Sequence, residues 1–411
     1  MASAGSGKRV LIVVQNLPVP FDRRVWLEAT TLRRHGYTVS VICPKARGFS
    51  ASYEVLEDVH IHRYALPFEA RGALGFLGEF AWCFLATLFK SVKVAAWHGF
   101  DVIHACNPPE TYWILGLLWR PFGKRFVFDH HDLSPEMYEA KFARPSRVLH
   151  AALRFLEWCT FRVADVAIAT NESCKRVAIE RGGMAEDRIF VVRSGPDLRR
   201  FRRYAPDPAL KAGRDKLVVY LGEMCKQDGV EYLLRALKIM REQGRGGDVF
   251  TVLVGGGPHQ EELRRYAGEL GLGTATRFTG RVSDDELCRI LSSADVAVDP
   301  DPKTPWSDKC TMNKIIEYMY FGLPIVCFDL TEHRVSAGDA ALYAAPNQEQ
   351  ALADALLQVL DDPAMRELMT QIGRARVEAK LAWQYSIPPL LATYDRIWRT
   401  EPAPLLRRTQ L

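Results

Sequence analysis

The chain has 411 residues, 48% of them hydrophobic and 25% charged, which is typical of a soluble globular protein of about two domains. Its formal net charge of +5 is too small to favour nucleic acid as a partner. The nine cysteines are scattered without C-x-x-C pairs, so they exclude a patterned zinc site and favour a reducing, cytosolic compartment.

The N-terminal half alternates between apolar runs and helical patterns. Residues 8–14, KRVLIVV, are typical of a buried parallel strand, and the segment before them is too short to predict a signal peptide. The GSGK in that segment lacks phosphate-loop spacing and precedes the strand. A helical pattern at residues 25–36 and an apolar run at 38–44 complete a βαβ unit, so we expect a doubly wound α/β domain. Its further strands are predicted at residues 59–66, 101–106, 125–130, 165–171 and 188–195.

Residues 73–89 raise the question of a membrane. The segment contains Glu79, is soon followed by two lysines and falls short of about 20 clean apolar residues, so we do not expect it to span a bilayer. We favour a buried helix in a core or between domains. The alternative is a helix lying on a bilayer, with aromatic side chains inserted and lysines near the headgroups. A second apolar stretch at residues 112–119, also followed by basic residues, supports that alternative.

The pattern restarts after a linker at residues 193–215 that is rich in Pro, Arg and Asp. A new leading strand at residues 216–222 begins a second α/β domain. We place an N-terminal domain at residues 1–196, a C-terminal domain at 197–376, and helices crossing back to the first domain plus a frayed tail at 377–411. The further strands of the second domain are predicted at residues 248–257, 277–282, 294–300, 323–329 and 341–346, and its helices at 230–244, 261–271 and 348–362.

The most informative stretch is residues 307–329, SDKCTMNKIIEYMYFGLPIVCFD. Together with ADVAVDP before it and the order of elements, it resembles the GT-B glycosyltransferases, in particular the retaining family-4 type, over nearly the whole chain. The resemblance implies an α/β fold of two Rossmann-like, doubly wound domains facing a cleft, with the acceptor on the first domain and a nucleotide-sugar donor on the second. It also implies that Glu317 binds the ribose of the donor.

Physical chemistry supports this role for Glu317. Open α/β sheets bind ligands at the carboxyl ends of their strands, and the N–H groups of a helix start favour phosphate. Asn313 and Lys314 lie within one turn of Glu317, so all three can share one face of a helix and bind the donor. The alternative is an exposed Lys–Glu pair of little consequence.

Other parts of the second domain also resemble donor-binding segments of the family. Gly255, Gly256 and Gly257 follow a predicted strand and would let the backbone approach the nucleotide, although a plain tight turn is the alternative. Gly222 ends the leading strand, and Arg281 lies where the family contacts the nucleobase. We therefore include all five residues in the predicted donor site.

In the first domain, FVFDHHDL resembles the strand-end loop that carries a histidine in the family. By this resemblance His131 contacts the donor sugar and Asp132 supports it. The D-H-H-D string imitates a metal site, but neighbouring residues on one loop seldom converge on one ion. Asp299 and Asp301 form a D-x-D string between prolines, and there too we favour a metal-free mechanism.

Two departures from the family concern the donor diphosphate. The family's G-R-x-x-x-x-K-G clamp is replaced by YLGEMCKQDG, with Glu223 and Asp228 at the cationic positions. Two acids facing a diphosphate would repel it, so we expect them to turn away. The carboxylate that the family places eight residues before Glu317 is replaced by Lys309. Lys226 could act as a substitute cation, but Lys309 and Lys314 are the better candidates for a relocated clamp.

The third departure is in the first domain, where paired glycines are replaced by PVPFDRRVW. We predict that Asp22, Arg23 and Arg24 bind phosphate or an acidic acceptor, because guanidinium groups suit both. The alternative is a capped helix with solvated arginines.

The resemblance implies transfer of a sugar from a nucleotide-diphosphate sugar with retention of configuration, without a metal or other cofactor. Catalysis would be electrostatic and would involve His131, Asp132, Lys309 and Glu317. The apolar helices and basic residues of the first domain favour a lipid-linked or polysaccharide acceptor, peripheral membrane contact and a place at the cytoplasmic face of the membrane. Two alternatives remain open: a catalytically inactive GT-B scaffold and a nucleotide-sugar 2-epimerase.

Overall fold

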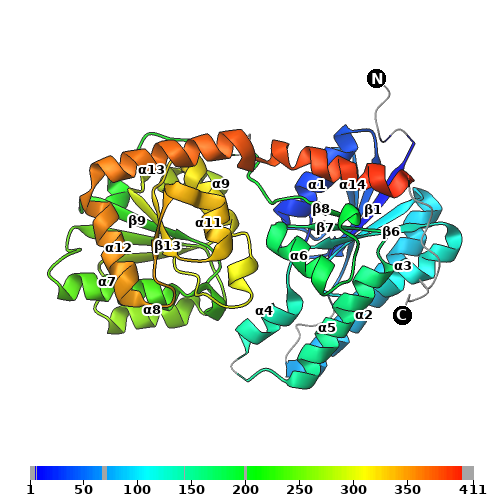
Figure 1. Cartoon of the computed structure of the whole chain (residues 1–411), viewed down its shortest axis with the longest axis horizontal. Helices are drawn as coiled ribbons and strands as arrows, with labels where there is room; N and C mark the ends of the chain where they lie inside the picture. Colours follow the sequence, from blue (N-terminus) through cyan, green and yellow to red (C-terminus); the bar gives the residue numbers. More distant parts are fainter. Residues whose placement is uncertain (1–4, 6, 67–71, 143, 199–200, 400–411) are drawn as a thin grey trace. The chain divides into compact units, whose positions relative to one another are not determined.

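The computed structural model describes residues 5, 7–66, 72–142, 144–198 and 201–399 (Figure 1). The chain divides into two compact units, one made of Met1–Ser194 and Ser386–Leu411 and the other of Gly195–Tyr385. The predicted boundary lay at 196/197, and the predicted return to the first domain lay at 377. The chain passes into the second unit after Ser194 and returns to the first at Ser386.

The first unit is built on an eight-stranded sheet in the order β3-β4-β2-β1-β5-β6-β7-β8. Every pairing is parallel except that of β3 with β4. The order reverses between β1 and β5, which makes this the switch point of a doubly wound sheet. The strands are β1 (Arg9–Val13), β2 (Thr38–Pro44), β3 (Tyr53–Leu56), β4 (Val59–Tyr64), β5 (Val102–Cys106), β6 (Arg125–His130), β7 (Val166–Ala169) and β8 (Ile189–Val191).

Helices cover both faces of this sheet. The helix α1 packs against α14, and α14 in turn packs on β7 and β8. In Figure 1, α2 and α5 lie on the other side of the sheet. The helix α3 contacts α5, and Trp119 at its end donates to Ser91 Oγ on α2 at 3.0 Å. The helices are α1 (Arg23–Arg34), α2 (Gly72–Trp97), α3 (Trp113–Trp119), α4 (Ser134–Lys141), α5 (Arg147–Val163), α6 (Glu172–Glu180) and α14 (Ile387–Arg399).

The second unit repeats the architecture with a six-stranded parallel sheet in the order β11-β10-β9-β12-β13-β14. Its switch point lies between β9 and β12. One apolar core lies under α7, α8 and α12, and a second lies under α9 and α10. The strands are β9 (Lys216–Leu221), β10 (Val249–Val254), β11 (Thr276–Gly280), β12 (Val296–Asp299), β13 (Ile325–Phe328) and β14 (Ala341–Ala344). The helices are α7 (Val230–Glu242), α8 (Gln260–Glu269), α9 (Asp284–Ser293), α10 (Asn313–Phe321), α11 (Thr331–Ala337), α12 (Glu349–Asp361) and α13 (Pro363–Arg376).

The predicted fold is confirmed, including the return of the C-terminal helix α14 to the first unit. Each apolar run that predicted a strand forms one. The strand β3 was missed because it is a largely exposed edge strand without an apolar run, and it pairs antiparallel with β4. Residues 400–411, the predicted frayed tail, lie outside the described residues.

The prediction of a buried helix at residues 73–89 is wrong for most of its described part. Within α2, Gly78–Trp97 is long and apolar enough to cross a membrane by length and composition, and 22% of it is buried. Its buried face carries Cys83, Thr87 and Ser91, at a spacing of four residues, and packs toward β2 and β4. The helix therefore lies along the sheet with its other face exposed. Nothing is described of the side chains of residues 72–74, 76 and 77.

Candidate functional site

In the second unit, the lysine at the second position of α10 points into the protein. Lys314 Nζ lies 3.2 Å from Asp299 Oδ1 and 2.9 Å from Asp301 Oδ1, and 5.0 Å from the centre of the Tyr220 ring. Both aspartates are buried at the carboxyl end of β12. The positive charge that Asp299 and Asp301 bind in this structure is thus the ammonium group of a lysine. In this structure the Lys314 ammonium binds two carboxyl groups, and its predicted role in clamping the donor diphosphate stays a prediction.

These three groups balance one another electrostatically. Burial alone would raise the pKa of Asp299, but the Lys314 ammonium holds it below its usual value. Burial and then the Asp299 charge raise the pKa of Asp301 well above its usual value. Burial opposes the charge on Lys314, yet the two aspartates raise its pKa well above that of a free lysine. The cluster thus pairs one cation with one carboxylate, and Asp301 favours its neutral form.

The glycines of the predicted donor loop bring two loops into contact. Gly255 has a φ of +124°, and a Cβ there would lie 1.8 Å from Gly222 O. A Cβ on Gly257 would lie 2.5 Å from Met224 O. The backbone N–H of Met224 donates to Gly256 O at 3.1 Å. Close approach of the loops after β9 and β10 therefore requires glycine at 255 and 257, whatever else the loop binds.

The two acids that replace the family's cationic clamp, Asp228 and Glu223, differ in their surroundings. The Asp228 carboxylate accepts a hydrogen bond from Cys225 N at 3.1 Å, so it turns into its own loop, as expected. Burial raises its pKa to about 6. Glu223 and Lys226 are exposed on the same loop.

The other predicted donor residues are spread along the start of α10 and the nearby loops. Glu317 is buried, whereas Asn313 is exposed at the first turn. The alternative of an exposed Lys–Glu pair is therefore wrong. Lys309 is half-buried in the short turn before α10, and Arg281 is exposed after β11. Leu221 N donates to Tyr318 Oη at 2.7 Å, which ties the end of β9 to this helix.

In the first unit, the start of α1 replaces the family's glycines with a capped helix. Asp22 Oδ1 accepts from Val25 N at 3.1 Å, and Arg23 is exposed. Arg24 points inward, where it donates to Val192 O at 2.8 Å and lies 2.9 Å from Asp129 Oδ1. Arg24 is thus not a solvated arginine, and the anion that it binds in this structure is the Asp129 carboxylate. The alternative of a capped helix is confirmed for Asp22.

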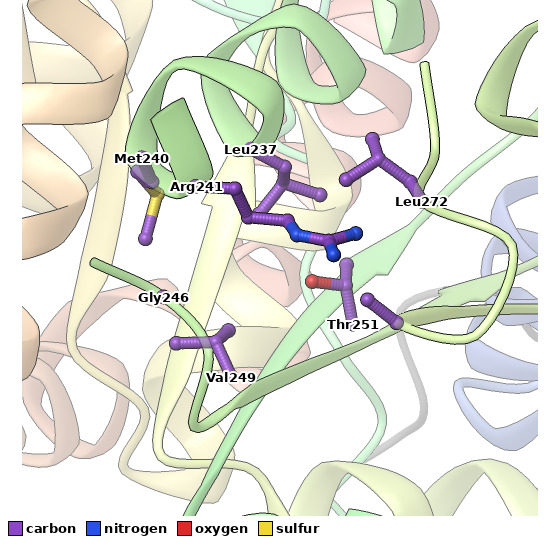
Figure 2. Close-up of a pocket in the computed structure, with 8 residues that line it drawn as sticks. Leu237, Met240, Arg241, Gly246, Val249, Thr251 and Leu272 are labelled. Carbon is purple, nitrogen blue, oxygen red and sulfur yellow. The ribbon is translucent and has the colours of Figure 1, made fainter. Parts of the chain in front are cut away.

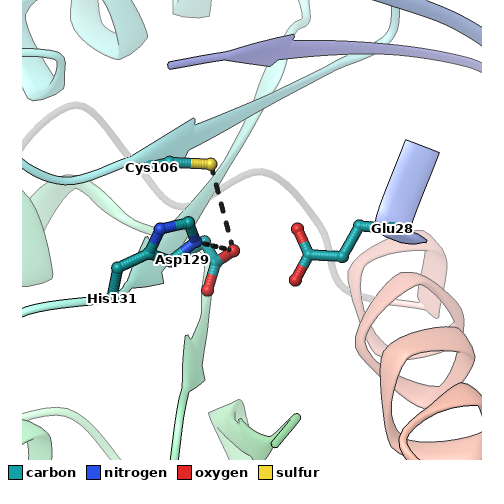
Figure 3. Close-up of side chains that lie close together, drawn as sticks. All are labelled: Glu28, Cys106, Asp129 and His131. Carbon is teal, nitrogen blue, oxygen red and sulfur yellow. Dashed lines mark hydrogen bonds and ion pairs between the residues drawn. The ribbon is translucent and has the colours of Figure 1, made fainter. Parts of the chain in front are cut away.

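Asp129, near the end of β6, is the centre of a buried cluster (Figure 3). Its Oδ2 accepts from His131 Nε2 at 2.6 Å and from His104 Nε2 at 3.1 Å. Burial would raise the pKa of Asp129, but the charges of Arg24 and then His131 hold it well below its usual value. Sequence reasoning missed this residue, although an aspartate inside the apolar run FVFDH was an available signal.

Glu28, on α1, faces Asp129 and is fully buried. Burial and then the Asp129 charge raise the pKa of Glu28 well above its usual value. With Glu28 neutral, Arg24 and Asp129 remain as the balanced pair of charges. As in the second unit, one carboxyl group is charged and its neighbour favours the neutral form.

The loop that carries His131 is fixed by Asn107. The backbone N–H groups of His131 and Asp132 donate to Asn107 Oδ1 at 2.6 and 3.2 Å. Asp132 was predicted to support His131, but the carboxylate that binds the imidazole belongs to Asp129. Burial raises the pKa of Asp132.

Glu28, Cys106, Asp129 and His131 form the group of described residues whose ligand atoms lie close enough, within 4.8 Å, to hold a metal ion (Figure 3). The Arg24 guanidinium already lies 3.1 Å from Glu28 and 2.9 Å from Asp129. Burial also raises the pKa of the Cys106 thiol well above its usual value, which opposes formation of a thiolate ligand. The chemistry of this group therefore favours the arginine over a divalent ion.

A small pocket beside α7 and β10 lies apart from the predicted site residues (Figure 2). Its lining is mainly apolar, and Arg241 donates from it to Gly271 O. The pocket contains none of the residues predicted to bind donor or acceptor. Its lining consists of Leu237, Met240, Arg241, Gly246, Val249, Thr251, Leu272 and Ala275.

Two family models together match most of the chain. Residues 22–200 match the family described as Glycosyltransferase Family 4, and residues 215–362 match that described as Glycosyl transferases group 1. The solved structure of sucrose-phosphate synthase from Thermosynechococcus elongatus superposes with a TM-score of 0.74 at 20% identity, over 95% of this chain and 99% of that one. This chain belongs to the GT-B glycosyltransferases.

Relatives of this glycosyltransferase act on different substrates. Glycogen synthase of Mycobacterium tuberculosis is 29% identical over 58% of this chain and 55% of its own length. A GDP-mannose-dependent phosphatidylinositol monomannoside mannosyltransferase of the same organism is 29% identical over 46% of this chain and 51% of its own. The chain thus spans about half the length of these relatives.

Among solved structures, Anabaena HepE in complex with UDP-glucose superposes with a TM-score of 0.69 at 17% identity. The superposition covers 94% of this chain and 99% of that one. At this identity the likeness establishes the fold alone.

Proposed function

We propose that this glycosyltransferase transfers a sugar from a nucleotide-diphosphate sugar to a lipid-linked or polysaccharide acceptor, with retention of the anomeric configuration. The donor binds the second unit, with its ribose on Glu317 and its base near Arg281. Because Lys314 is held by two aspartates, Lys309 and Lys226 are the cations that we assign to the diphosphate. His131 of the first unit binds a hydroxyl of the sugar. No metal takes part.

The observation that carries the donor site is the meeting of three segments at the carboxyl edge of the second sheet. The loops after β9 and β10 touch through Gly222 and Gly255, and a Cβ on Gly222 would lie 3.4 Å from Lys314 Nζ. Glu317 is one turn further along α10. Ligands of open α/β sheets bind at this edge near the switch point. The UDP-glucose complex of a protein with the same fold supports a nucleotide sugar as the ligand.

A screen of nucleotide sugars by thermal shift tests the donor. At least one should raise the melting temperature, because a ligand of the native state stabilises it by mass action. Loss of hydrogen bonds to a charged group, worth about 1.5–3 kcal/mol, should raise Kd at least about tenfold in Glu317→Gln. Glu261→Gln, an exposed acid of the same unit, is the control. No stabilising nucleotide sugar, or equal binding by both variants, would contradict the proposal.

The stabilising donor then distinguishes the reactions. With acceptor, we expect a new glycoside whose anomeric configuration, read by NMR, matches that of the donor. Without acceptor, conversion of the donor to its epimer would instead identify a 2-epimerase. Donor binding without any turnover over a panel of lipid-linked and polysaccharide acceptors would identify an inactive scaffold.

The outer surface of α2, α3 and α5 supports a membrane-associated acceptor. Leu85 and Phe89 on α2 are 60% and 61% exposed, Phe122 after α3 is 68% exposed, and Phe155 on α5 is 59% exposed. Lys93 Nζ lies 4.6 Å from the centre of the Phe89 ring. Large apolar side chains with cations beside them are typical of surfaces that rest on a bilayer. We propose that this surface holds the enzyme at the cytoplasmic face of a membrane.

Co-sedimentation with vesicles tests this surface. The chain should bind vesicles of phosphatidylcholine with phosphatidylglycerol more strongly than neutral ones, because anionic lipid attracts lysine. A Leu85→Glu/Phe89→Glu variant should lose binding. The matched control is Val335→Glu/Leu368→Glu, which adds two charges at exposed apolar positions of the second unit. Failure of the wild type to bind, or equal loss in both variants, would contradict membrane contact.

A further inference from the structure

The Asp129 cluster contains two imidazoles directed at one carboxylate oxygen. His131 Nε2 and His104 Nε2 lie 2.6 and 3.1 Å from Asp129 Oδ2. An ionised carboxylate only accepts hydrogen bonds, so both nitrogens must carry a proton. The other nitrogen of His104 lies 2.8 Å from Tyr394 Oη, whose hydroxyl can donate to it. The contacts therefore select the Nε2–H form of each imidazole.

The carboxylate itself is held from several sides. Arg24 binds Asp129 Oδ1 at 2.9 Å and is fixed in turn by Val192 O and Ser194 Oγ. Asp129, Glu28 and His104 are fully buried, whereas 15% of the His131 side chain is exposed. His131 is thus the member of the cluster that a ligand can reach. With Nε2 bound to Asp129, its Nδ1 is the nitrogen left for that ligand.

We propose that Asp129 is a positioning residue, which holds His131 as the Nε2–H tautomer so that Nδ1 accepts a hydrogen bond from a sugar hydroxyl. This inference rests on the proposed function, in which His131 binds the sugar. A fixed orientation matters because an imidazole that is free to rotate or to exchange tautomers presents an acceptor only part of the time. Asp132, the acid next to His131 in sequence, does not have this role.

The tautomer can be measured without any substrate. Two-dimensional ¹H–¹⁵N long-range NMR of protein labelled with ¹⁵N-histidine, at a pH where imidazole is neutral, reports which nitrogen carries the proton. His131 is assigned by the signals lost in His131→Gln. We expect the Nε2–H form in the wild type. The Nδ1–H form, or an even mixture, would overturn the proposal even if every Asp129 variant failed to fold.

Two amide substitutions in the same cluster provide a matched pair. Asp129→Asn offers a donor as well as an acceptor, so the His131 signals should shift toward mixed tautomers. Glu28→Gln resembles the neutral acid that burial favours, so the His131 signals should stay as in the wild type. Unchanged His131 signals in Asp129→Asn would contradict the proposal.

A double-mutant cycle separates positioning from a structural role once a donor is known. Asp129→Asn should lower kcat at least about tenfold on its own, because a misplaced imidazole no longer orients the sugar. In a His131→Gln background it should lower kcat no further, because it acts through that imidazole. Equal losses in both backgrounds would identify a purely structural residue. Absence of any donor would refute the proposed function while leaving the NMR result standing.

Discussion

The two units place a cation in the same way at the switch point of each sheet. Arg24 is the second residue of α1 and Lys314 the second residue of α10. Each binds a buried aspartate at the carboxyl end of a central strand, Asp129 or Asp299. In each unit the pKa of that aspartate is lowered, whereas that of a neighbouring carboxyl group is raised.

The difference lies in what else each aspartate binds. Asp129 also binds His131, which reaches the surface. The imidazole beside Asp299 belongs to His333, which is fully buried with its Nε2 at 3.4 Å. The first cluster therefore orients a group that a ligand can reach, whereas the second holds the loop after β12 in place. A cation at a helix start near a switch point is thus not by itself a phosphate ligand.

Removing the cation of the second cluster should have the largest effect on stability. Lys314→Met leaves the buried Asp299 uncompensated, so we expect the free energy of unfolding to fall by about 3–5 kcal/mol. Urea unfolding measures this, with the exposed Lys380→Met as the control, expected within about 0.5 kcal/mol of the wild type. A fall below 1 kcal/mol would mean that the ion pairs of Lys314 contribute little to stability, which would favour Lys314 as a diphosphate ligand.

Amide substitutions of Asp299 and Asp301 test which of the two carboxyl groups carries the charge. Asp299→Asn removes the charge that balances Lys314, so we expect a loss of about 2–3 kcal/mol. Asp301→Asn resembles the neutral form that burial favours and should cost less than about 1 kcal/mol. Urea unfolding at pH 7 measures both. Equal losses would mean that the two carboxyl groups share the charge.

The pH dependence of stability should reveal Asp228, which lies close to the second cluster. Its pKa of about 6 is above its usual value, so the folded state binds a proton that the unfolded state has released. Stability therefore falls as the pH rises from about 4 to 6, by about 1–2 kcal/mol for a partly exposed carboxyl group. Asp228→Asn should lose this part of the decline. Urea unfolding of both proteins at pH 4.5 and 7.5 measures it, and parallel declines would contradict the shift.

The smallest expected effect concerns how the two helices begin. Asp22 caps α1, whereas Met312 at the start of α10 gives no side-chain cap. Asp22→Ala should therefore lower stability by about 1 kcal/mol. Met312→Ala removes no cap and reports only lost packing. Measured by urea unfolding, an unchanged stability in Asp22→Ala would show that the Arg24 cluster alone fixes the start of α1.

Much of the fold was predictable from local patterns. Buried strands such as KLVVYLG are almost entirely apolar, because helices cover both of their faces. This pattern can be recognised in the sequence without knowing which elements pack against the strand. The turn after α10 was equally predictable, because glycine is the residue that most often ends a helix, and Gly322 does so here with a φ of 77°. The exposed face of α2 was not, because hydropathy does not reveal whether another element covers an apolar helix.

The candidate site was predictable only in part. Glu317 and the glycine loop were identified by their resemblance to segments that the family carries in the same order. Their roles in binding remain predictions. The direction of the Lys314 side chain could not be predicted from its position on α10, because the aspartates that it binds lie at the end of β12. His131 was identified as a candidate, but its partner was predicted to be the adjacent Asp132. Sequence distance is a poor guide to contacts here, because successive side chains at the end of a strand point to opposite faces.

Local sequence patterns are enough to predict two α/β units and their strands, because these depend on apolar periodicity and turn residues within short segments. Which charges are paired follows from the three-dimensional arrangement alone. Arg24 meets Asp129 across 105 positions of the chain because the strand order of the first sheet brings α1 beside the end of β6. Such a pair depends on sheet topology and side-chain direction, which no local pattern encodes.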